Sequence, residues 1–338
     1  MAVVGRKSPK LVNVMRVREN QSKKNGQPND LTPVSAILTT VIKPEHRPLT
    51  PIQARLLSMP TDDEELNIVY QHSILCQTCI PYRDPGATRI WQRRNGKVRL
   101  ELLAGRVLDP NLDEVVDVGL PFGPKPRLVL FHLNAEALRT GSPLINLDDS
   151  LTAFVKRTLK LDVDGRTIRS VKEQLNRLSA ADFRFYSSYE GHAITVKGTL
   201  IEGLDLWVSK DERQRVLWPS YVQFSRRYFD SLLQHAVPLN EEAIKRLSHS
   251  AMGLDAYTWL AQRLHRVHPS KSDFVPWTSL KEQFGPDYGR IGDFRRVFTR
   301  TLAQVKAVYH EARYGLDEKG MRLHNSAPPV ARRFFLNP

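Results

Sequence analysis

A set of arginines at helical spacing in residues 291–309 has the composition needed to bind an anionic polymer. At about 100° per residue, one side of a helix here is apolar and the other is cationic. The cationic side consists of Arg295, Arg296, Thr299, Arg300, Ala303 and Lys306, with Arg290 just before it and no carboxylate among them. Arginine can donate two N–H groups to a phosphate or a guanine edge, and small neighbours permit close approach to a groove. The pattern predicts a helix that contacts double-stranded DNA.

A second segment, residues 167–179, shows a similar two-sided pattern. Its apolar residues are Ile168, Val171, Leu175 and Leu178, spaced three, four and three apart. The other side and its flank give the second set of predicted DNA contacts: Arg166, Thr167, Arg169, Ser170, Lys172 and Arg177. The alternative is an ordinary solvated helix face. Two such helices in one chain, each followed by a predicted β-hairpin, favour DNA binding.

Each predicted hairpin carries cations of its own. Lys197 belongs to the first hairpin, and Arg313, Lys319 and Arg322 belong to the second. We expect them to contact the DNA backbone beside the helix, although such residues can equally serve to keep a hairpin soluble.

Other chemistries find little support in the sequence. The phosphate-binding pattern G-x-x-x-x-G-K-[ST] is absent. His265 and His268 are a poor match to the paired histidines of nicking initiators. Cys76 and Cys79, with His72 nearby, make half a zinc site without an evident fourth ligand, so we expect buried thiols instead. We therefore predict no catalytic residue, no metal site and no cofactor, and a protein that is not an enzyme.

Composition agrees with an anionic partner. The 338 residues have a formal net charge of +14, which favours nucleic acid, a lipid surface or an acidic protein. No apolar run approaches the ~18 residues of a membrane span, and two cysteines fit a reducing compartment, so we expect a cytoplasmic protein that does not bind membranes. Residues 1–30 hold seven basic and two acidic residues and begin a predicted flexible basic arm over residues 1–60.

The order of predicted elements indicates the fold class. We expect a helix over 62–76, a hairpin of strands 89–94 and 97–103 around Asn95-Gly96, a second strand pair through 114–118 and helices over 125–140, 151–159 and 167–179. The helix over 125–140 should end at Thr140-Gly141-Ser142-Pro143, and Asp149 and Ser150 can cap the helix that follows. Strands follow at 183–189, 192–201 and 205–208. A second series has helices at 224–233, 241–247 and 254–264, a strand at 274–277, a helix opened by a capping box at 279–282, the helix 291–309 and strands 314–316 and 321–323.

Three helices followed by a hairpin are typical of a winged helix. The prediction is therefore an α+β protein with two tandem winged-helix domains, at residues 61–222 and 223–330, preceded by the basic arm and followed by a tail at 331–338. The second domain would be the main DNA-reading domain.

Several longer stretches resemble the plasmid-encoded RepA family of replication initiators. The resemblance is carried by residues 75–81, 119–128, 133–143, 149–154 and 165–169, and more weakly by 256–260 and 323–329. It implies binding to directly repeated origin sites, called iterons, without covalent chemistry. It also implies origin opening, recruitment of the host initiator DnaA and the replicative helicase, and a monomer in equilibrium with a homodimer formed through the first domain.

Two alternatives remain open at this stage. A transcriptional repressor of the same fold would use the same DNA contacts without a role in replication. A nicking rolling-circle initiator would be an enzyme and is the less supported of the two. The sequence of the repeats and their spacing do not follow from the residues.

Overall fold

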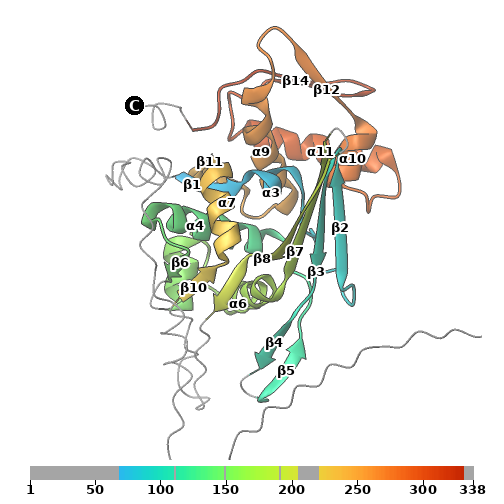
Figure 1. Ribbon diagram of the computed structural model, residues 1–338. Helices are drawn as coiled ribbons and strands as arrows, with labels where there is room; N and C mark the ends of the chain where they lie inside the picture. The colour runs from blue at the N-terminus through green and yellow to red at the C-terminus, as the bar shows by residue number, and fades with distance from the viewer. Residues whose placement is uncertain (1–67, 110–111, 148–149, 190–191, 205–220, 331–338) are drawn as a thin grey trace, which may run out of the picture. The chain divides into compact units, whose positions relative to one another are not determined.

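The computed structural model describes residues 68–109, 112–147, 150–189, 192–204 and 221–330. All of them belong to one compact unit, Leu49–Pro338, drawn in Figure 1. The predicted basic arm, the tail, the strand at 205–208 and the cap residue Asp149 lie outside the described residues.

The first described element corrects the sequence prediction. Residues 68–72, expected to be helical, form strand β1 (Ile68–His72), and only the short helix α3 (Ser73–Gln77) follows. Strand β1 pairs in antiparallel register with β11 (Ala236–Asn240). Because this partner lies far along the chain, local apolar spacing could not reveal it.

A four-stranded antiparallel sheet forms one layer of the unit. Its order is β2-β3-β7-β8, with bounds β2 (Ile90–Asn95), β3 (Val98–Leu103), β7 (Asp182–Tyr189) and β8 (His192–Thr199). The predicted β2–β3 hairpin is confirmed, but Asn95 pairs with Val98, so the loop is Gly96-Lys97 rather than Asn95-Gly96. Gly96 has a φ of +55°, and glycine at the first loop position with positive φ is typical of type II′ turns.

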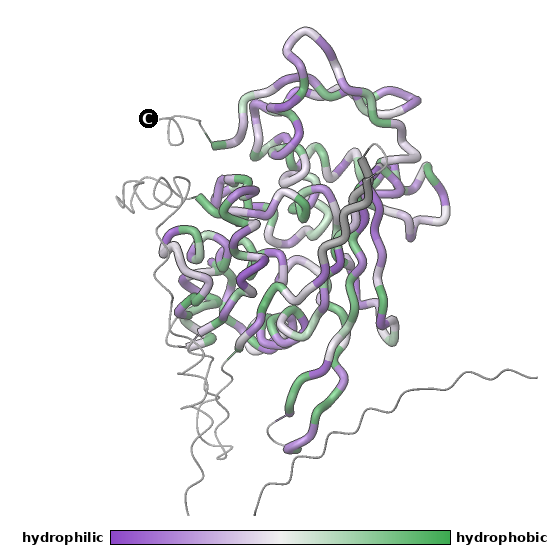
Figure 2. The backbone as a smooth tube through the Cα atoms, viewed as in Figure 1, coloured by the Kyte–Doolittle hydropathy of each residue, from purple (hydrophilic) through white to green (hydrophobic). Residues whose placement is uncertain are grey.

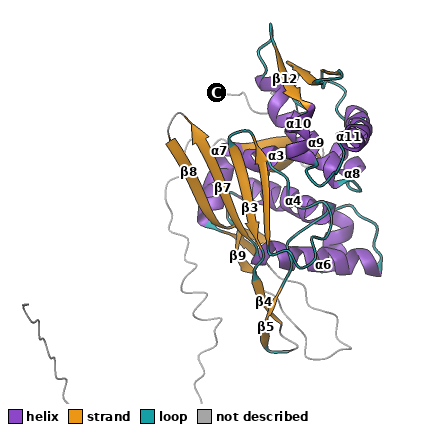
Figure 3. Ribbon diagram, turned by 90° about the vertical axis from the view of Figure 1, so that its right-hand side faces the viewer, coloured by secondary structure: helices purple, strands orange, loops and turns teal. Residues whose placement is uncertain are grey.

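Helices lie on one side of this sheet (Figure 3). They are α4 (Pro124–Thr140), the short pair α5 (Leu151–Ala153) and η1 (Phe154–Thr158), and α6 (Gly165–Ala180). As predicted, α4 ends at Gly141 and Ser150 caps α5 by accepting from the Ala153 N–H. Gly141 has the left-handed backbone conformation that glycine favours at helix ends. Leu100, Leu102 and Phe183 of the sheet are fully buried.

A hairpin extends from the end of β3 away from the sheet (Figure 1). It consists of β4 (Arg106–Asp109) and β5 (Glu114–Asp117), which confirms the predicted strand at 114–118. Apolar residues occupy both strands (Figure 2), and Leu108 and Val115 are more than half exposed. A separate three-stranded sheet, in the order β6-β10-β9, contains β6 (Leu144–Asn146), β9 (Ile201–Leu204) and β10 (Tyr221–Phe224).

The following helices are α7 (Arg226–His235), α8 (Glu241–Leu247) and α9 (Ala251–Arg263), with the short turn η2 (Leu264–Arg266). Phe224, predicted to begin a helix, is instead the last residue of β10, and Ser225 caps α7 through its hydroxyl. Every residue of α9 except Arg263 is buried, so this helix is a central core element.

The last elements are β12 (Ser272–Pro276), α10 (Trp277–Phe284), α11 (Ile291–Lys306), β13 (Tyr314–Leu316) and β14 (Gly320–His324). The three strands form one sheet in the order β12-β14-β13. The predicted capping box is wrong because α10 begins two residues earlier, at Trp277, after Pro276 and without a side-chain cap. The predicted long helix and hairpin are confirmed, the helix ending at Lys306.

The buried apolar residues form one continuous cluster that includes Phe131 of α4, Leu175 of α6, Trp259 of α9 and Phe298 of α11. The structure thus contains both helices and sheets in one unit, as the α+β prediction requires. The division into domains at 222/223 stays a prediction, as does the tandem winged-helix arrangement.

Candidate nucleic-acid interface

Helix α11 is held to the protein by the apolar side that the sequence predicted. Phe294, Phe298, Leu302 and Val305 are at most 1% exposed. Phe298 packs on Phe284 of α10 with ring centroids 4.9 Å apart, and Phe294 lies 5.2 Å from Phe298. This aromatic packing fixes the rotation of α11 about its own axis, so its other side faces away from the core.

That other side, here called the α11 cationic face, consists of Arg295, Arg296, Thr299, Arg300, Ala303 and Lys306. Arg296, Thr299, Arg300 and Ala303 are exposed, and Arg295 is half-buried. Arg290, the residue before the helix, is exposed as well. The structure therefore presents most of the predicted cations and small residues on one open surface.

The partners of these side chains differ. The Arg295 guanidinium lies 5.1 Å from the centre of the Trp277 ring. Arg296 pairs with exposed Asp293 at 3.2 Å, a carboxylate that the sequence prediction had left out of this face. In the part of the chain that the structure describes, no side chain forms a hydrogen bond or ion pair with Arg300. No arginine of the face is enclosed by carboxylates from those residues.

Lys306 has a different environment from the arginines. Its ammonium group donates to the carbonyls of His310 and Ala312, at 2.8 and 2.6 Å. These contacts hold the chain that leaves the helix, so Lys306 stabilises the C-terminal end of α11 while its charge remains at the surface.

The turn between β13 and β14 adds further cations beside the α11 cationic face. The Asp317 carboxylate accepts from the backbone N–H groups of Lys319 and Gly320 at 2.8 and 2.9 Å, and these bonds keep the pKa of Asp317 below its usual value. Lys319, Arg322 and Arg313 are exposed. Arg322 lies 3.6 Å from Asp317 and stacks over Phe274.

Helix α6 presents a less open set of cations. Its apolar side is confirmed, since Val171, Leu175 and Leu178 are at most 1% exposed. Arg166 and Arg169 are exposed, whereas Ser170 and Lys172 are half-buried. The Thr167 hydroxyl donates to Asp164, the residue that caps the helix. Backbone and hydroxyl bonds from Thr167 lower the pKa of the Asp164 carboxyl. Thr167 therefore supports the helix end.

Contrary to the prediction from the sequence, Arg177 does not face outward. One terminal nitrogen donates to Glu173 at 2.6 Å, and the other donates to the Leu120 carbonyl at 3.1 Å and lies 3.4 Å from Asp84. The guanidinium also lies 5.0 Å from the Phe122 ring centre. With carboxylate, carbonyl and aromatic partners, this arginine links α6 to the loop before α4. Lys197, in β8, is exposed as predicted.

The thiols and histidines have the environment expected of core residues. Cys76 and Cys79 are both 2% exposed, and burial raises the pKa of each thiol well above its ordinary value. The His72 ring accepts from the Ile74 N–H as the cap of α3, and burial lowers its pKa to about 4. Among the described residues, no group of three or more histidine, cysteine or acidic side chains could hold a metal ion. His265 lies against the Ala261 carbonyl at 3.0 Å.

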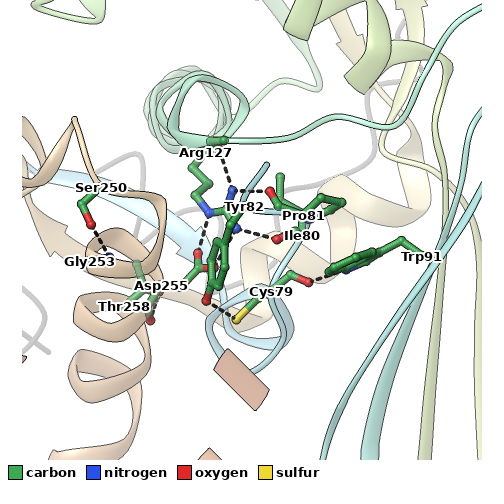
Figure 4. Close-up of polar contacts among 11 residues, drawn as sticks. Cys79, Ile80, Pro81, Tyr82, Trp91, Arg127, Ser250, Gly253, Asp255 and Thr258 are labelled. Atoms are coloured by element: carbon green, nitrogen blue, oxygen red, sulfur yellow. Dashed lines mark hydrogen bonds and ion pairs between the residues drawn. The ribbon is translucent and has the colours of Figure 1, made fainter. Parts of the chain in front are cut away.

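A buried ion pair that was not predicted from the sequence joins α4 to α9 (Figure 4). Arg127 binds the Asp255 carboxylate through two nitrogens, both at 2.7 Å. It also donates to the carbonyls of Ile80 and Gly123 at 2.8 and 2.6 Å. The side chains of Arg127 and Asp255 are 3% and 10% exposed. A cation within the apolar run of α4 was the available signal, but its partner is 128 residues away.

One protein-family model matches part of the chain. Residues 120–278 match the family model described as plasmid encoded RepA protein. The matched segment is 159 of the 338 residues, so the similarity to the plasmid-encoded RepA family covers just under half of the chain. The match contains α6, Arg127 and Asp255 and stops at the start of α10, before α11. It supports a role in the initiation of plasmid replication.

Two solved structures are similar to this chain in fold comparison. Both are crystal structures of domains 2 and 3 of RctB. The first is 10% identical in sequence and covers 76% of this chain and 99% of that one, with a TM-score of 0.48. The second is 11% identical and covers 74% and 94%, with a TM-score of 0.44. No curated protein matches the sequence.

Among the described residues, no helix combines the length and the apolar character needed to cross a bilayer.

Proposed function

We propose that this protein is a RepA-type initiator of plasmid replication that binds double-stranded origin DNA through α11 and the β13–β14 hairpin. The observation that carries the proposal is the α11 cationic face, with Arg296 and Arg300 exposed and the opposite side locked into an aromatic core. Arginines on a helix of this kind can enter the major groove and donate to guanine or phosphate.

The order of elements in the last part of the chain supports a winged-helix mode of binding. Helix α9 is followed by β12, α10, α11 and the β13–β14 hairpin, and the three strands form one sheet. In such an arrangement the last helix is the recognition helix and the hairpin is the wing. Lys319 at the hairpin turn would then contact the backbone next to the groove.

The first part of the chain would contribute a second, weaker contact. Arg166 and Arg169 at the start of α6, and Lys197 in β8, are exposed. We propose that these residues bind phosphates, because charge at an exposed helix start can position DNA without reading its sequence. Together the two parts would form the tandem winged-helix protein predicted from the sequence.

The finer parts of the proposal follow from the family resemblance. The DNA sites would be iterons, and binding would open the origin and recruit DnaA and the replicative helicase. The protein would be a monomer on iterons, in equilibrium with a homodimer, and would act without covalent chemistry. Its net charge of +14 supports DNA as the principal partner.

A footprint with a matched pair of variants tests the proposal. The wild-type protein should protect repeated sites in the DNA next to its gene. Arg300→Ala should weaken binding to those sites by about 1–3 kcal/mol if Arg300 reads a base. Arg226→Ala, which removes an arginine of α7 that is exposed and paired with Asp230, should bind as the wild type does. Absence of any protected site would refute the proposal.

The two alternative functions are separated by different experiments. A repressor without a replication role predicts that a plasmid carrying Arg300→Ala is still maintained, whereas an initiator predicts its loss. A nicking enzyme predicts a cut strand or a tyrosyl-DNA adduct when supercoiled origin plasmid is incubated with Mg²⁺ or Mn²⁺. We expect plasmid loss and no nick.

A further inference from the structure

Trp277 contacts both parts of the proposed DNA-binding surface. It is the first residue of α10 and is 4% exposed. Its backbone N–H donates to the Lys319 carbonyl at 3.1 Å, and its indole N–H donates to the Asp317 carbonyl at 2.9 Å. On its other side, the ring lies 5.1 Å from the Arg295 guanidinium. One buried side chain thus joins the hairpin turn to the α11 cationic face.

The turn that Trp277 holds is itself closely packed. Asp317 accepts from the N–H groups of Lys319 and Gly320, and its own N–H donates to the Gly320 carbonyl at 3.0 Å. A Cβ atom on Gly320 would lie 2.3 Å from the Val275 carbonyl oxygen, so only glycine fits there. These bonds leave the turn little internal freedom. Its orientation relative to α11 therefore depends on the contacts that the turn makes with residues outside it.

The contact with Arg295 fixes the helix side of the same junction. A guanidinium within about 6 Å of an indole centre is attracted to the ring. Phe294, the neighbour of Arg295, meets the Trp277 ring edge-on at 6.5 Å and is fully buried. Trp277 therefore contacts two successive residues of α11, one in the core and one at the surface.

We infer that Trp277 is a positioning residue for DNA recognition. It holds the β13–β14 turn at a fixed distance and angle from the α11 cationic face, so that Lys319 and the helix arginines contact one duplex at the same time. This inference rests on the proposed function, because it assigns the geometry of the surface that binds DNA. Trp277 itself would not contact the DNA.

Two tryptophan variants separate positioning from general packing. Trp277→Phe keeps an aromatic ring for Phe294 and Arg295 but removes the bond to the Asp317 carbonyl. Trp259→Phe is the matched control, because Trp259 is 1% exposed and packs edge-on to Phe284 in the same core. Circular dichroism melts show whether both variants fold. Arg295→Met, a change on a half-buried surface side chain, tests the helix side of the junction if Trp277→Phe does not fold.

A double-mutant cycle with Lys319→Ala gives the decisive measurement. In the wild type and in Trp259→Phe, Lys319→Ala should weaken binding to origin DNA by about two- to fivefold, as expected for a lost phosphate contact. In the Trp277→Phe or Arg295→Met background, the effect of Lys319→Ala should be smaller, because the turn keeps its backbone bond to residue 277 but loses part of the side-chain junction with α11. An equal effect of Lys319→Ala in all backgrounds would overturn the inference.

Hydrogen exchange of the DNA-free protein provides a readout independent of binding. Trp277→Phe should increase deuterium uptake in residues 314–323, while Trp259→Phe should leave that segment unchanged. Unchanged uptake in both variants would also overturn the inference. If the wild type binds no origin DNA, the proposed function fails. The exchange result still decides whether Trp277 holds the turn.

Discussion

Helices α6 and α11 have the same length and a similar sequence pattern, yet they use their cations differently. Each has 16 residues with an apolar side in the core. Arg177 of α6 is enclosed by Glu173, Asp84 and a carbonyl group. Arg300 of α11 has no such partner among the described residues. The comparison teaches that the spacing of cations on a helix predicts an exposed cationic face only where no neighbouring segment of the chain contacts those cations.

The largest expected effect is a difference in DNA affinity between the two helices. Arg296→Ala combined with Arg300→Ala should weaken binding to origin sites by about 1–3 kcal/mol for each arginine that reads a base. The matched double variant on α6, Arg166→Ala with Arg169→Ala, should weaken binding to origin sites by less than about 1 kcal/mol. It should weaken binding to random DNA by the same amount. Fluorescence anisotropy with both DNAs measures this, and equal losses for the two pairs would remove the distinction.

The next effect concerns stability. Arg177→Met should lower the free energy of unfolding by about 1–3 kcal/mol, because Glu173 and the Leu120 carbonyl lose charged hydrogen-bond donors. Urea unfolding followed by circular dichroism measures the change. Arg226→Met is the control and should change stability by less than about 1 kcal/mol, because its pair with Asp230 is exposed. If Arg177→Met instead weakened DNA binding at unchanged stability, α6 would be a recognition surface like α11.

Acidification should separate stability from binding. Burial lowers the pKa of His72 and of His132 from 6.5 to about 4. Because the folded protein holds these rings neutral, their contribution to stability is complete above pH 6.5 and is lost as the pH falls toward 4. The loss should be on the order of 1 kcal/mol per histidine at pH 5.5.

Urea unfolding at pH 7.5 and 5.5 measures that loss, and His132→Gln should reduce the pH dependence. DNA affinity at pH 6 should stay near its value at pH 7.5, because arginines remain charged. A steep fall in affinity over this range would indicate that a histidine contributes to binding.

The smallest effect comes from the carboxylates beside each arginine set. Asp293→Asn removes the exposed partner of Arg296 and should strengthen binding by about 0.2–1 kcal/mol, an effect that high salt should reduce. Glu173→Gln on α6 removes a partner of Arg177 and should reduce stability while leaving affinity unchanged. Anisotropy titrations at low and high salt measure the DNA affinity of both variants, and urea unfolding measures the stability of Glu173→Gln. Weaker DNA binding by Asp293→Asn would contradict the assigned role of Arg296.

In the proposed DNA-binding site, residue spacing predicted which side chains are exposed but not which residues they contact. The apolar and cationic sides of α11 were predictable from spacing alone, as were the exposed positions of Arg296 and Arg300. The stacking of Arg295 on Trp277 was not, because Trp277 lies in a different helix. Similarly, Arg177 has the spacing of a surface cation, and only the approach of Asp84 and Leu120 from the preceding part of the chain encloses it.

The sequence by itself determined the elements whose signals are local. Helical periodicity placed α6 and α11, polar turn residues placed the β2–β3 and β13–β14 hairpins, and Ser150 marked a helix start. Tertiary structure alone decided that residues 68–72 form a strand, because β11 supplies their hydrogen-bond partners from more than 160 residues away. It also decided that Arg127 meets Asp255. Spacing along a chain reports which face of an element a residue occupies, but only folding decides what that face meets.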